Sequence, residues 1–240
     1  MSNQIKPIKL SFFLTPPHSC PYISEQDAQT LFLSPEVHTD TLLYSALIDK
    51  GFRRSGEHIY RPHCESCNAC ISIRVPVNHF TPNKQQKRCL KKSKAFSYKT
   101  EPAHFNQQHY QLFDKYISAR HRDGDMYPTS VHQYKEFLLT DWLECSYLNF
   151  YDIATQKLVA TSVYDHVNGG LSAVYTYFDP DYSQYSPGRL AILKLIEIAR
   201  QNALNYFYLG YWIKSSQKMA YKGEYRPLEC FVNDQWRYLR

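Results

Sequence analysis

Three cysteines separated by two-residue gaps are the strongest chemical signal in the sequence. Cys64, Cys67 and Cys70 lie in the segment R-P-H-C-E-S-C-N-A-C. Thiolates at this spacing can converge on one metal ion or cluster, and Cys20, in the turn-rich segment H-S-C-P-Y, is the best candidate for a fourth ligand. The reserve ligands are His18 and His63. The pattern predicts either a structural or regulatory zinc or iron-sulfur site, or a tight turn of reduced cysteines.

A basic run without any Asp or Glu follows at residues 83–99. Spacings of three, four and seven residues place several of its cations on one helical face, and such a face suits a phosphate backbone. RNA is therefore the favoured partner, and a solvated surface helix is the alternative. The candidate RNA-binding residues are Lys84, Lys87, Arg88, Lys91, Lys92 and Lys94.

Two further segments carry clustered cations. Arg53 and Arg54 are adjacent in a glycine-bounded turn, and His121 and Arg122 precede two carboxylates. Arginine forks onto carboxylates and phosphates with two parallel hydrogen bonds, so either segment can hold an acidic ligand. The alternative is a pair of structural turns closed by internal salt bridges.

Two strand ends combine aromatic and charged residues. Tyr175, Tyr177 and Asp179 lie where one expected strand ends. The loop after another expected strand carries Lys218, Tyr221 and Lys222. Loops that leave strand ends commonly carry functional sites, although sheet packing alone would also explain the tyrosines.

The elements that must position these residues can be read from periodicity and turn signals. Strands are expected at residues 9–15, 52–60, 71–77, 146–154, 158–166, 171–178 and 206–209, with a hairpin at 228–239. Helices are expected at residues 24–32, 39–50, 105–117, 131–142 and 187–203. This order predicts an α+β protein with a mixed sheet and flanking helices. A smaller cysteine-bearing subdomain at residues 1–90 and a larger domain at residues 91–240 are expected.

Composition narrows the protein classes. The chain has 240 residues, 43% hydrophobic and 15% aromatic, with a net charge of +6, so a folded core and polyanionic partners are both expected. No apolar run reaches the roughly 20 residues that span a bilayer, and seven scattered cysteines do not fit a secreted disulfide framework. These features predict a soluble cytoplasmic protein with no membrane partner. Phosphate-binding, dinucleotide-binding and hydrolase-elbow motifs are absent.

Five segments together resemble one known family. They are G-F-R-R-S-G, I-Y-R-P-H-C-x-x-C-x-A-C, H-R-x-G-D-M-Y-P, Y-T-Y-F-D-P and L-G-Y-W-I followed by K-M-A-Y-K, in order between Cys20 and Trp236. The sequence closely resembles the arginyl-tRNA-protein transferase family, and within it the short bacterial form that donates leucine. The resemblance implies a C-terminal half similar to the N-acetyltransferase fold. The cysteines depart from the wider family, where C-x-x-C is followed by an adjacent pair.

The resemblance implies leucyl transfer from leucyl-tRNA to the N-terminal Asp or Glu of a protein, which marks that protein for degradation. The aminoacyl ester is already activated, so no cofactor is required for the transfer, and positioning of the two substrates should dominate. On this hypothesis the acidic side chain is bound by Arg53, Arg54, His121 and Arg122, the incoming α-amine by Tyr175, Tyr177 and Asp179, and the tRNA end or the oxyanion by Lys218, Tyr221 and Lys222. The run from Lys84 to Lys94 would grip the acceptor stem.

Three alternatives remain open from the sequence. The first is arginyl transfer by the same chemistry, because donor choice depends on the volume and charge of a pocket. The second is a non-catalytic zinc-bearing RNA-binding protein, suggested by the cysteine triplet and the basic run. The third is a small-molecule N-acetyltransferase, suggested by the expected order of meander, helix and strand.

Overall fold

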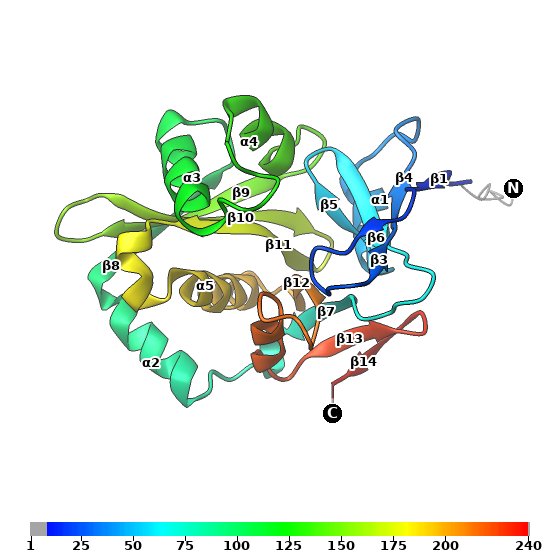
Figure 1. Ribbon diagram of the computed structural model, residues 1–240. Coiled ribbons are helices and arrows are strands. Elements are labelled where there is room, and N and C mark those ends of the chain that lie inside the picture. Colours follow the sequence, from blue (N-terminus) through cyan, green and yellow to red (C-terminus); the bar gives the residue numbers. More distant parts are fainter. Residues whose placement is uncertain (1–8, 240) are drawn as a thin grey trace, which may run out of the picture.

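The computed structural model describes residues 9–239, in which the chain forms one large sheet, one small sheet and flanking helices (Figure 1). The strands of the large sheet are β7 (Ile71–Pro76), β8 (Phe96–Pro102), β9 (Cys145–Asp152), β10 (Leu158–Val167), β11 (Gly170–Phe178), β12 (Tyr206–Trp212), β13 (Glu229–Val232) and β14 (Gln235–Tyr238). Their order across the sheet is β14-β13-β7-β12-β11-β10-β9-β8. The β11–β12 pair is parallel and the other neighbouring pairs are antiparallel.

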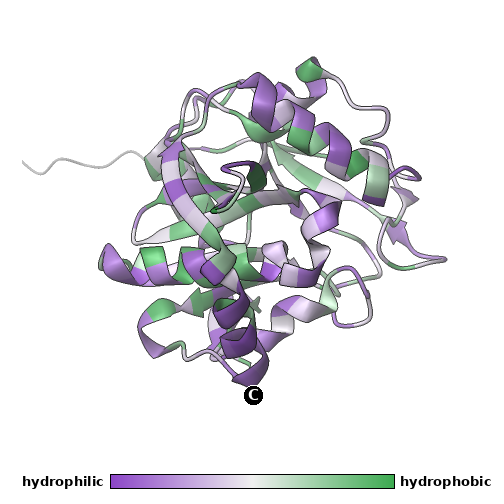
Figure 2. Cartoon of the chain, turned by 90° about the vertical axis from the view of Figure 1, so that its left-hand side faces the viewer, coloured by the Kyte–Doolittle hydropathy of each residue, from purple (hydrophilic) through white to green (hydrophobic). Residues whose placement is uncertain are grey.

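Helices cover both faces of this sheet. They are α2 (Lys84–Lys92), α3 (Gln107–Arg120), α4 (Val131–Leu138) and α5 (Pro187–Gln201), with 3-10 helices η1 (Val77–His79), η2 (Ser93–Ala95), η3 (Pro180–Tyr185) and η4 (Ala220–Glu224). On one face, α5 buries Leu190, Leu193 and Ile196 in a core shared with Phe207. On the opposite face, α3 and α4 enclose a second core (Figure 1). The helices are banded in hydrophilic and hydrophobic residues (Figure 2), as amphipathic packing requires. No helix within residues 9–239 is long and apolar enough to cross a membrane.

The N-terminal part of the chain forms a four-stranded antiparallel sheet beside the large one. Its strands are β1 (Phe12–Leu14), β4 (Thr30–Leu33), β5 (Arg53–Ser55) and β6 (His58–Pro62), in the order β1-β4-β6-β5, and the two-stranded pair β2 (His18–Ser19) and β3 (Asp27–Ala28) lies nearby. Helix α1 (Thr41–Ile48) packs Tyr44 and Ile48 against Leu33 and Ile59 in a third core. One face of the small sheet is therefore buried.

The large sheet opens between β11 and β12. These strands pair only from Gly170 to Ser172 on β11, opposite Tyr206 to Tyr208 on β12. Beyond this point β12 carries a register irregularity before Gly210, whose φ of +85° lies in the left-handed region that favours glycine. From Ala173 onward, β11 therefore has an edge that no described strand covers.

Much of the predicted element order is confirmed, including the β9–β10–β11 meander, helix α5 and the β13–β14 hairpin, whose turn residues Asn233 and Asp234 both have positive φ. The α+β class is confirmed by the mixed sheet with its helices. The helix expected at residues 24–32 is wrong, because Thr30–Leu33 forms β4. Leu33 points into the core, and cross-strand pairing with β1 and β6 outweighs the local helical preference.

The strand expected at residues 52–60 is instead the β5–β6 hairpin, which bends at Gly56. The φ of Gly56 is +54°, and a Cβ atom there would lie 1.7 Å from the carbonyl oxygen of Glu136. Only glycine allows this close approach to α4. The helix expected at residues 131–142 ends earlier, at Leu138.

The two sequence halves share the large sheet. Strand β7 lies between β12 and β13, although it precedes them by more than a hundred residues in the chain. The domain boundary expected between residues 90 and 91 falls inside α2. A division at that position stays a proposal.

Candidate active site

Two cations meet where the large sheet opens. The Arg53 guanidinium donates from Nη2 to the Ala173 carbonyl oxygen at 2.6 Å, on the uncovered edge of β11. The Lys222 ammonium donates from Nζ to the Tyr211 carbonyl oxygen at 3.1 Å, on β12. Both approach Gly210, since a Cβ atom there would lie 3.5 Å from Lys222 Nζ and 3.7 Å from Arg53 Nη2. We call Arg53 and Lys222 the cation pair.

The cation pair is electrostatically unsatisfied. Arg53 is only 5% exposed, and its buried Nη1 atom has no hydrogen-bond partner among the described residues. Burial, and then the positive charge of Arg53, lower the pKa of Lys222 to about 7. Within residues 9–239 no carboxylate lies within ion-pairing distance of either residue. Such an arrangement favours an incoming anion, which would neutralise two desolvated charges.

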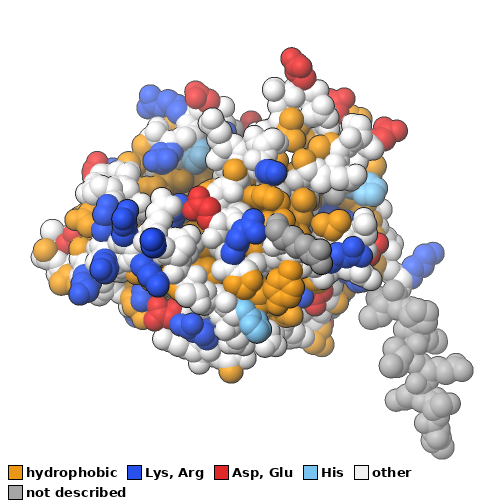
Figure 3. All heavy atoms as spheres, turned by 90° about the horizontal axis from the view of Figure 1, so that it is seen from below, with side chains coloured by type: hydrophobic (Ala, Val, Ile, Leu, Met, Phe, Trp, Pro, Cys, Tyr) orange, Lys and Arg blue, Asp and Glu red, His pale blue; other side chains and the backbone are white. Residues whose placement is uncertain are grey.

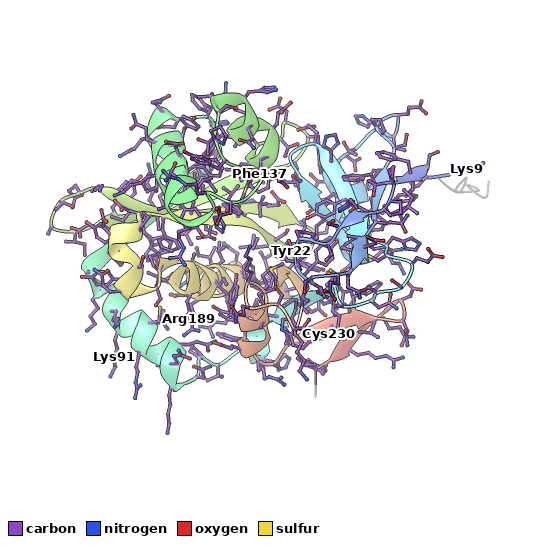
Figure 4. The ribbon with its side chains drawn as sticks, in the orientation of Figure 1. Lys9, Tyr22, Lys91, Phe137, Arg189 and Cys230 are labelled. Atoms are coloured by element: carbon purple, nitrogen blue, oxygen red, sulfur yellow. The ribbon has the colours of Figure 1, made fainter. Side chains whose placement is uncertain are left out.

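Phenol side chains form one wall beside the cation pair. The Tyr60 ring on β6 lies 6.2 Å from the ring of Tyr211, whose hydroxyl donates to the Gly51 carbonyl oxygen at 2.9 Å. Burial, and then the neighbouring Tyr22 phenol, raise the pKa of Tyr60 to about 12. Tyr22 lies between the small sheet and the large one (Figure 4) and is 40% exposed. This wall therefore reaches solvent at Tyr22.

Aromatic rings from α3, α4 and β11 form a second wall. The Tyr175 ring lies 5.1 Å from the Phe137 ring and 6.3 Å from the Tyr116 ring. The Tyr116 ring lies 5.4 Å from the imidazole of His121. Burial, followed by the charges of Lys218 and Arg120, lowers the pKa of His121, so its neutral form is favoured near pH 7.

Arg54 differs from Arg53 in its hydrogen bonds, although both residues are only 5% exposed. Its guanidinium forms a buried bidentate ion pair with Asp165, with Nε to Oδ2 at 2.9 Å and Nη2 to Oδ1 at 2.5 Å. It also donates to the carbonyl oxygens of Gly56 and Leu138. This network joins β5 to β10 and α4. The hydrogen-bond donors of Arg54 are therefore used within the protein.

The polar groups of Tyr177 and Asp179 also have hydrogen-bond partners within the protein. Tyr177 is fully buried, and its hydroxyl lies 2.9 Å from that of Tyr134. Asp179 is also fully buried and accepts hydrogen bonds from Lys115 Nζ at 2.5 Å and Lys157 Nζ at 2.6 Å. Burial alone would raise the pKa of Asp179, but these two lysines lower it to about 2. The carboxylate therefore links α3 and the turn before β10 to the end of β11.

The other residues predicted for the site, Arg122, Lys218 and Tyr221, are exposed on the protein surface. Arg122 is exposed, with its guanidinium carbon 5.5 Å from the centroid of the Tyr127 ring. Lys218 is exposed and lies within electrostatic range of His121. Tyr221 is 41% exposed and lies within range of Tyr116. Tyr175, His121, Lys218 and Tyr221 are thus linked through Tyr116 and its neighbours, while Arg53 and Lys222 meet at Gly210. Arg122 follows His121 in the chain and has Tyr127 as its neighbour.

The four cysteines expected to bind a metal are neighbours but do not form a ligand set as placed. All four are half-buried free thiols. Burial, and then the thiolates of Cys20, Cys64 and Cys67, raise the pKa of Cys70 to about 11, so the four lie within electrostatic range of one another. Within residues 9–239, however, no three His, Cys, Asp or Glu side chains are close enough together to hold a metal ion. The positions therefore do not fit zinc or an iron-sulfur cluster, although the donor chemistry does.

The basic run forms an exposed surface on α2 and η2. A capping box starts α2, with Gln86 N donating to Asn83 Oδ1 at 2.9 Å and Asn83 N donating to Gln86 Oε1 at 2.9 Å. Gln86 and Cys89 face inward, and all six predicted cations are exposed. Lys and Arg side chains gather over α2, on the left of the molecule seen from below (Figure 3). We call these six residues the α2 basic surface.

Sequence reasoning gave no role to several residues that complete the site. Tyr22, Tyr60, Tyr116 and Gly210 are the main ones. Tyr60 and Gly210 lie inside the segments that carry the family resemblance, and Tyr22 follows Cys20 by two residues. Their proximity depends on strand pairing between distant parts of the chain, which no local pattern reveals.

Comparison with known proteins identifies the family to which this chain belongs. The protein-family model "Arginine-tRNA-protein transferase, N terminus" matches residues 18–88 of the sequence. A second family model, "Arginine-tRNA-protein transferase, C terminus", matches residues 108–232. The chain therefore belongs to the arginine-tRNA-protein transferase family.

Among its relatives are proteins named aspartate/glutamate leucyltransferase. The one from Saccharophagus degradans is 48% identical over 95% of this chain and 96% of its own length. The one from Pseudomonas aeruginosa is also 48% identical, with the same coverage of both chains. Among solved structures, FemX matches with a TM-score of 0.43 and 8% identity, covering 84% of this chain and 79% of its own.

Proposed function

We propose that this protein transfers leucine from leucyl-tRNA to the N-terminal Asp or Glu of other proteins and so marks them for degradation. The relatives named aspartate/glutamate leucyltransferase support this at 48% identity. The structural observation that carries the proposal is the cation pair, because two desolvated cations without a carboxylate suit the side chain of an N-terminal Asp or Glu.

In this proposal Arg53 binds the substrate carboxylate through its free Nη1, and Lys222 binds the same carboxylate from across Gly210. A neutral N-terminal residue would leave both cations unpaired, and a buried unpaired charge is costly. Selectivity for acidic N-termini follows from that penalty. Arg54 supports Arg53 through the hairpin that it ties to Asp165.

The chemistry is aminolysis of an ester. The neutral α-amine attacks the carbonyl carbon of the leucyl ester, the C–N bond forms, and the bond to the ribose oxygen breaks. The proton lost by the amine passes to the leaving ribose oxygen. An α-amine has an ordinary pKa of about 7.7–8.0, so part of it is neutral near pH 7. A neutral His121 at the rim can take up the proton from the ammonium form. Positioning of the two substrates supplies most of the rate gain.

The donor is proposed to lie along the uncovered edge of β11, with the leucine side chain against the second wall. Tyr175, Phe137 and Tyr116 present aromatic rings there. An apolar lining suits leucine and offers no carboxylate for the guanidinium of arginine. The α2 basic surface is proposed to contact the tRNA backbone, since six exposed cations can replace counterions on phosphates.

The proposal also covers the fold type, the role of Tyr175, the cellular location and the cysteines. An N-acetyltransferase-like fold is supported by the meander, α5 and the parallel strand β12 that follows it. Tyr175 is the most suitable phenol to orient the α-amine, because Tyr177 and Asp179 are engaged within the protein. A cytoplasmic location suits a substrate such as leucyl-tRNA. Transfer needs no metal in this scheme, and zinc or iron-sulfur binding by the cysteines would require them to move.

The test is a transfer assay with purified protein. Labelled leucyl-tRNA and arginyl-tRNA are each incubated with peptides that begin with Asp, Glu, Asn or Ala. We expect label from leucyl-tRNA on the Asp and Glu peptides only. Label from arginyl-tRNA would change the proposed donor, and equal or absent labelling of all four peptides would contradict the proposed function.

A further inference from the structure

An unbroken row of side chains crosses the small sheet and ends at the cation pair. Phe13 on β1 is directly opposite Phe32 on β4, Phe32 is opposite Tyr60 on β6, and Tyr60 is opposite Arg53 on β5. Directly opposed residues of antiparallel strands project from the same face of a sheet. We call Phe13, Phe32 and Tyr60 the aromatic row.

The rings of the aromatic row contact one another. Those of Phe13 and Phe32 are stacked with centroids 5.4 Å apart, and those of Phe32 and Tyr60 are 5.9 Å apart. Tyr60 in turn contacts Tyr211, next to the cation pair. The row therefore joins the protein surface to the site without a polar interruption.

The opposite face of the small sheet already has its packing partners. Leu33 and Ile59 point from that face into the core. On the aromatic face, Phe13 is 48% exposed on the edge strand β1. Phe32 and Tyr60 are half-buried, so the row is most accessible at Phe13 and becomes more enclosed toward the cation pair. An apolar strip of this kind at the surface is a candidate interaction surface.

We propose that the aromatic row binds the residues at positions two to four of the protein substrate and prefers apolar side chains there. The inference rests on the proposed function, because it uses the cation pair as the subsite for position one. Arg53 has an unpartnered Nη1 at the inner end of the row. A peptide whose carboxylate reaches that atom must continue outward, and the aromatic row is the apolar surface that continues from it.

The dimensions agree with this occupant. Neighbouring strands are about 4.8 Å apart, so three spacings from Arg53 to Phe13 cover about 14 Å. An extended peptide advances about 3.3 Å per residue, which places about four residues over the row. Only an unfolded N-terminal segment can lie there, so the site selects proteins by the flexibility of their N-terminus as well as by its charge.

A peptide fits this surface better than a second RNA contact. The α2 basic surface lies on the other side of the molecule from the small sheet (Figure 1). The exposed cations that would hold a phosphate backbone are concentrated over α2 (Figure 3). The α2 basic surface, not the aromatic row, supplies the clustered exposed cations on which nucleic-acid binding depends.

The test scans one Phe through positions two to five of the peptide Asp-Gly-Ser-Gly-Ser-Gly. The ratio kcat/KM is measured with saturating leucyl-tRNA for the wild type, Phe13→Ser and Phe12→Ser. Phe12 is the matched control, because it is 37% exposed on the same strand but pairs with Leu33 on the opposite face. We expect Phe to raise kcat/KM about 5- to 20-fold at one or more of positions two to four in the wild type and in Phe12→Ser. In Phe13→Ser the gain at the outermost of these positions should be lost.

Three outcomes would overturn the inference. They are a wild type indifferent to Phe at positions two to four, an equal loss in Phe12→Ser, and a Phe13→Ser variant that keeps its peptide preference but has a raised KM for leucyl-tRNA. The last would favour RNA on this surface. If none of the proteins labels any peptide, the proposed function fails. Peptide binding to the aromatic row is then measured by fluorescence anisotropy with an Asp-Phe peptide labelled at its C-terminus. This peptide should bind the wild type more tightly than it binds Phe13→Ser.

Discussion

The Arg53 guanidinium and the Lys222 ammonium approach each other across Gly210, where a methyl group would lie 3.7 Å from Arg53 Nε and 3.5 Å from Lys222 Nζ. Like charges held this close repel each other, and the repulsion contributes to the lowered pKa of Lys222. A carboxylate between them would convert repulsion into two attractive contacts. In the proposed function, substrate binding and the charge state of Lys222 are therefore coupled.

Loss of the Arg53 charge should reduce selectivity for acidic N-termini. A hydrogen bond to a charged group contributes about 1.5–3 kcal/mol, so Arg53→Gln should lower kcat/KM for an Asp peptide about 10- to 100-fold. Arg61→Gln is the control, because Arg61 lies on the neighbouring strand β6 and its guanidinium packs over the Phe52 ring instead. Initial rates with leucyl-tRNA measure the effect, and thermal unfolding verifies that both variants fold. Equal losses in the two variants would argue against a carboxylate contact at Arg53.

Binding of an acidic peptide should take up a proton. Lys222 has a pKa of about 7, so at pH 8 it is mostly neutral in the free protein. A bound carboxylate favours the ammonium form and raises this pKa, so affinity for acidic peptides should fall as the pH rises above 7. Calorimetry at pH 8 in phosphate and in Tris should report the uptake of up to about one proton. An Asn peptide, which has the same α-amine, is the reference, and Lys222→Met should abolish the difference between the two peptides.

Neutralisation of the α2 basic surface should weaken binding of tRNA alone. The triple variant Lys87→Gln, Arg88→Gln and Lys91→Gln should raise KM for leucyl-tRNA. It should also reduce the slope of log K against log salt by about two to three, because each phosphate contact contributes about 0.9. The KM for the peptide should not change. The matched control neutralises three exposed cations elsewhere, namely Lys50, Lys135 and Arg200. A similar effect of that control would point to net charge rather than to α2.

The buried ion pair between Arg54 and Asp165 should matter for stability. Both side chains are fully buried, and removal of one charge from such a pair costs about 3–5 kcal/mol. Asp165→Asn should therefore lower the urea midpoint strongly without changing the m-value. The double variant Arg54→Met, Asp165→Leu should recover part of the loss, because it leaves no charge unpaired. Additive losses in the double variant would mean that the two residues contribute independently.

Asp179 should contribute stability that disappears in acid. Its pKa is about 2, below the value of about 3.9 for an unfolded chain, so the ion pair with Lys115 and Lys157 stabilises the folded state above pH 4. The contribution, about 2 kcal/mol, should fall as the pH drops from 4 to 2. Denaturation of the wild type and Asp179→Asn at several pH values measures it. The difference between the two proteins should shrink through that window and stay constant from pH 5 to 7.

The sequence predicted elements well where local signals agree with tertiary packing. The apolar spacing of Leu190, Leu193 and Ile196 specifies α5, and Asn233-Asp234 specifies the β13–β14 turn. The helix predicted at residues 24–32 was wrong, because the leucines of Thr30–Leu33 fit a helix face as well as a strand face. Only pairing with β1 and β6 decides between them. The local pattern contains no information about those partners.

The local sequence does not show which of the predicted site residues lie together in the fold. Arg53 and Arg54 are adjacent and chemically identical, yet alternation along β5 sends Arg54 toward Asp165 and Arg53 toward the Ala173 carbonyl oxygen on the uncovered edge of β11. The sequence shows two arginines, and only the strand register separates the one with an unpartnered nitrogen from the one paired with Asp165. Cys20 lies within electrostatic range of Cys70, as expected from its turn-rich segment. The direction in which each sulfur atom points cannot be read from the local sequence.

The position of β7 between β12 and β13 has a consequence for synthesis on the ribosome. This strand emerges early, but its hydrogen-bonding partners are translated more than a hundred residues later. Until then its apolar residues Ile73 and Val75 have no sheet to join, so the nascent chain must remain partly open and exposed to chaperones. Completion of the large sheet is delayed until β13 leaves the exit tunnel.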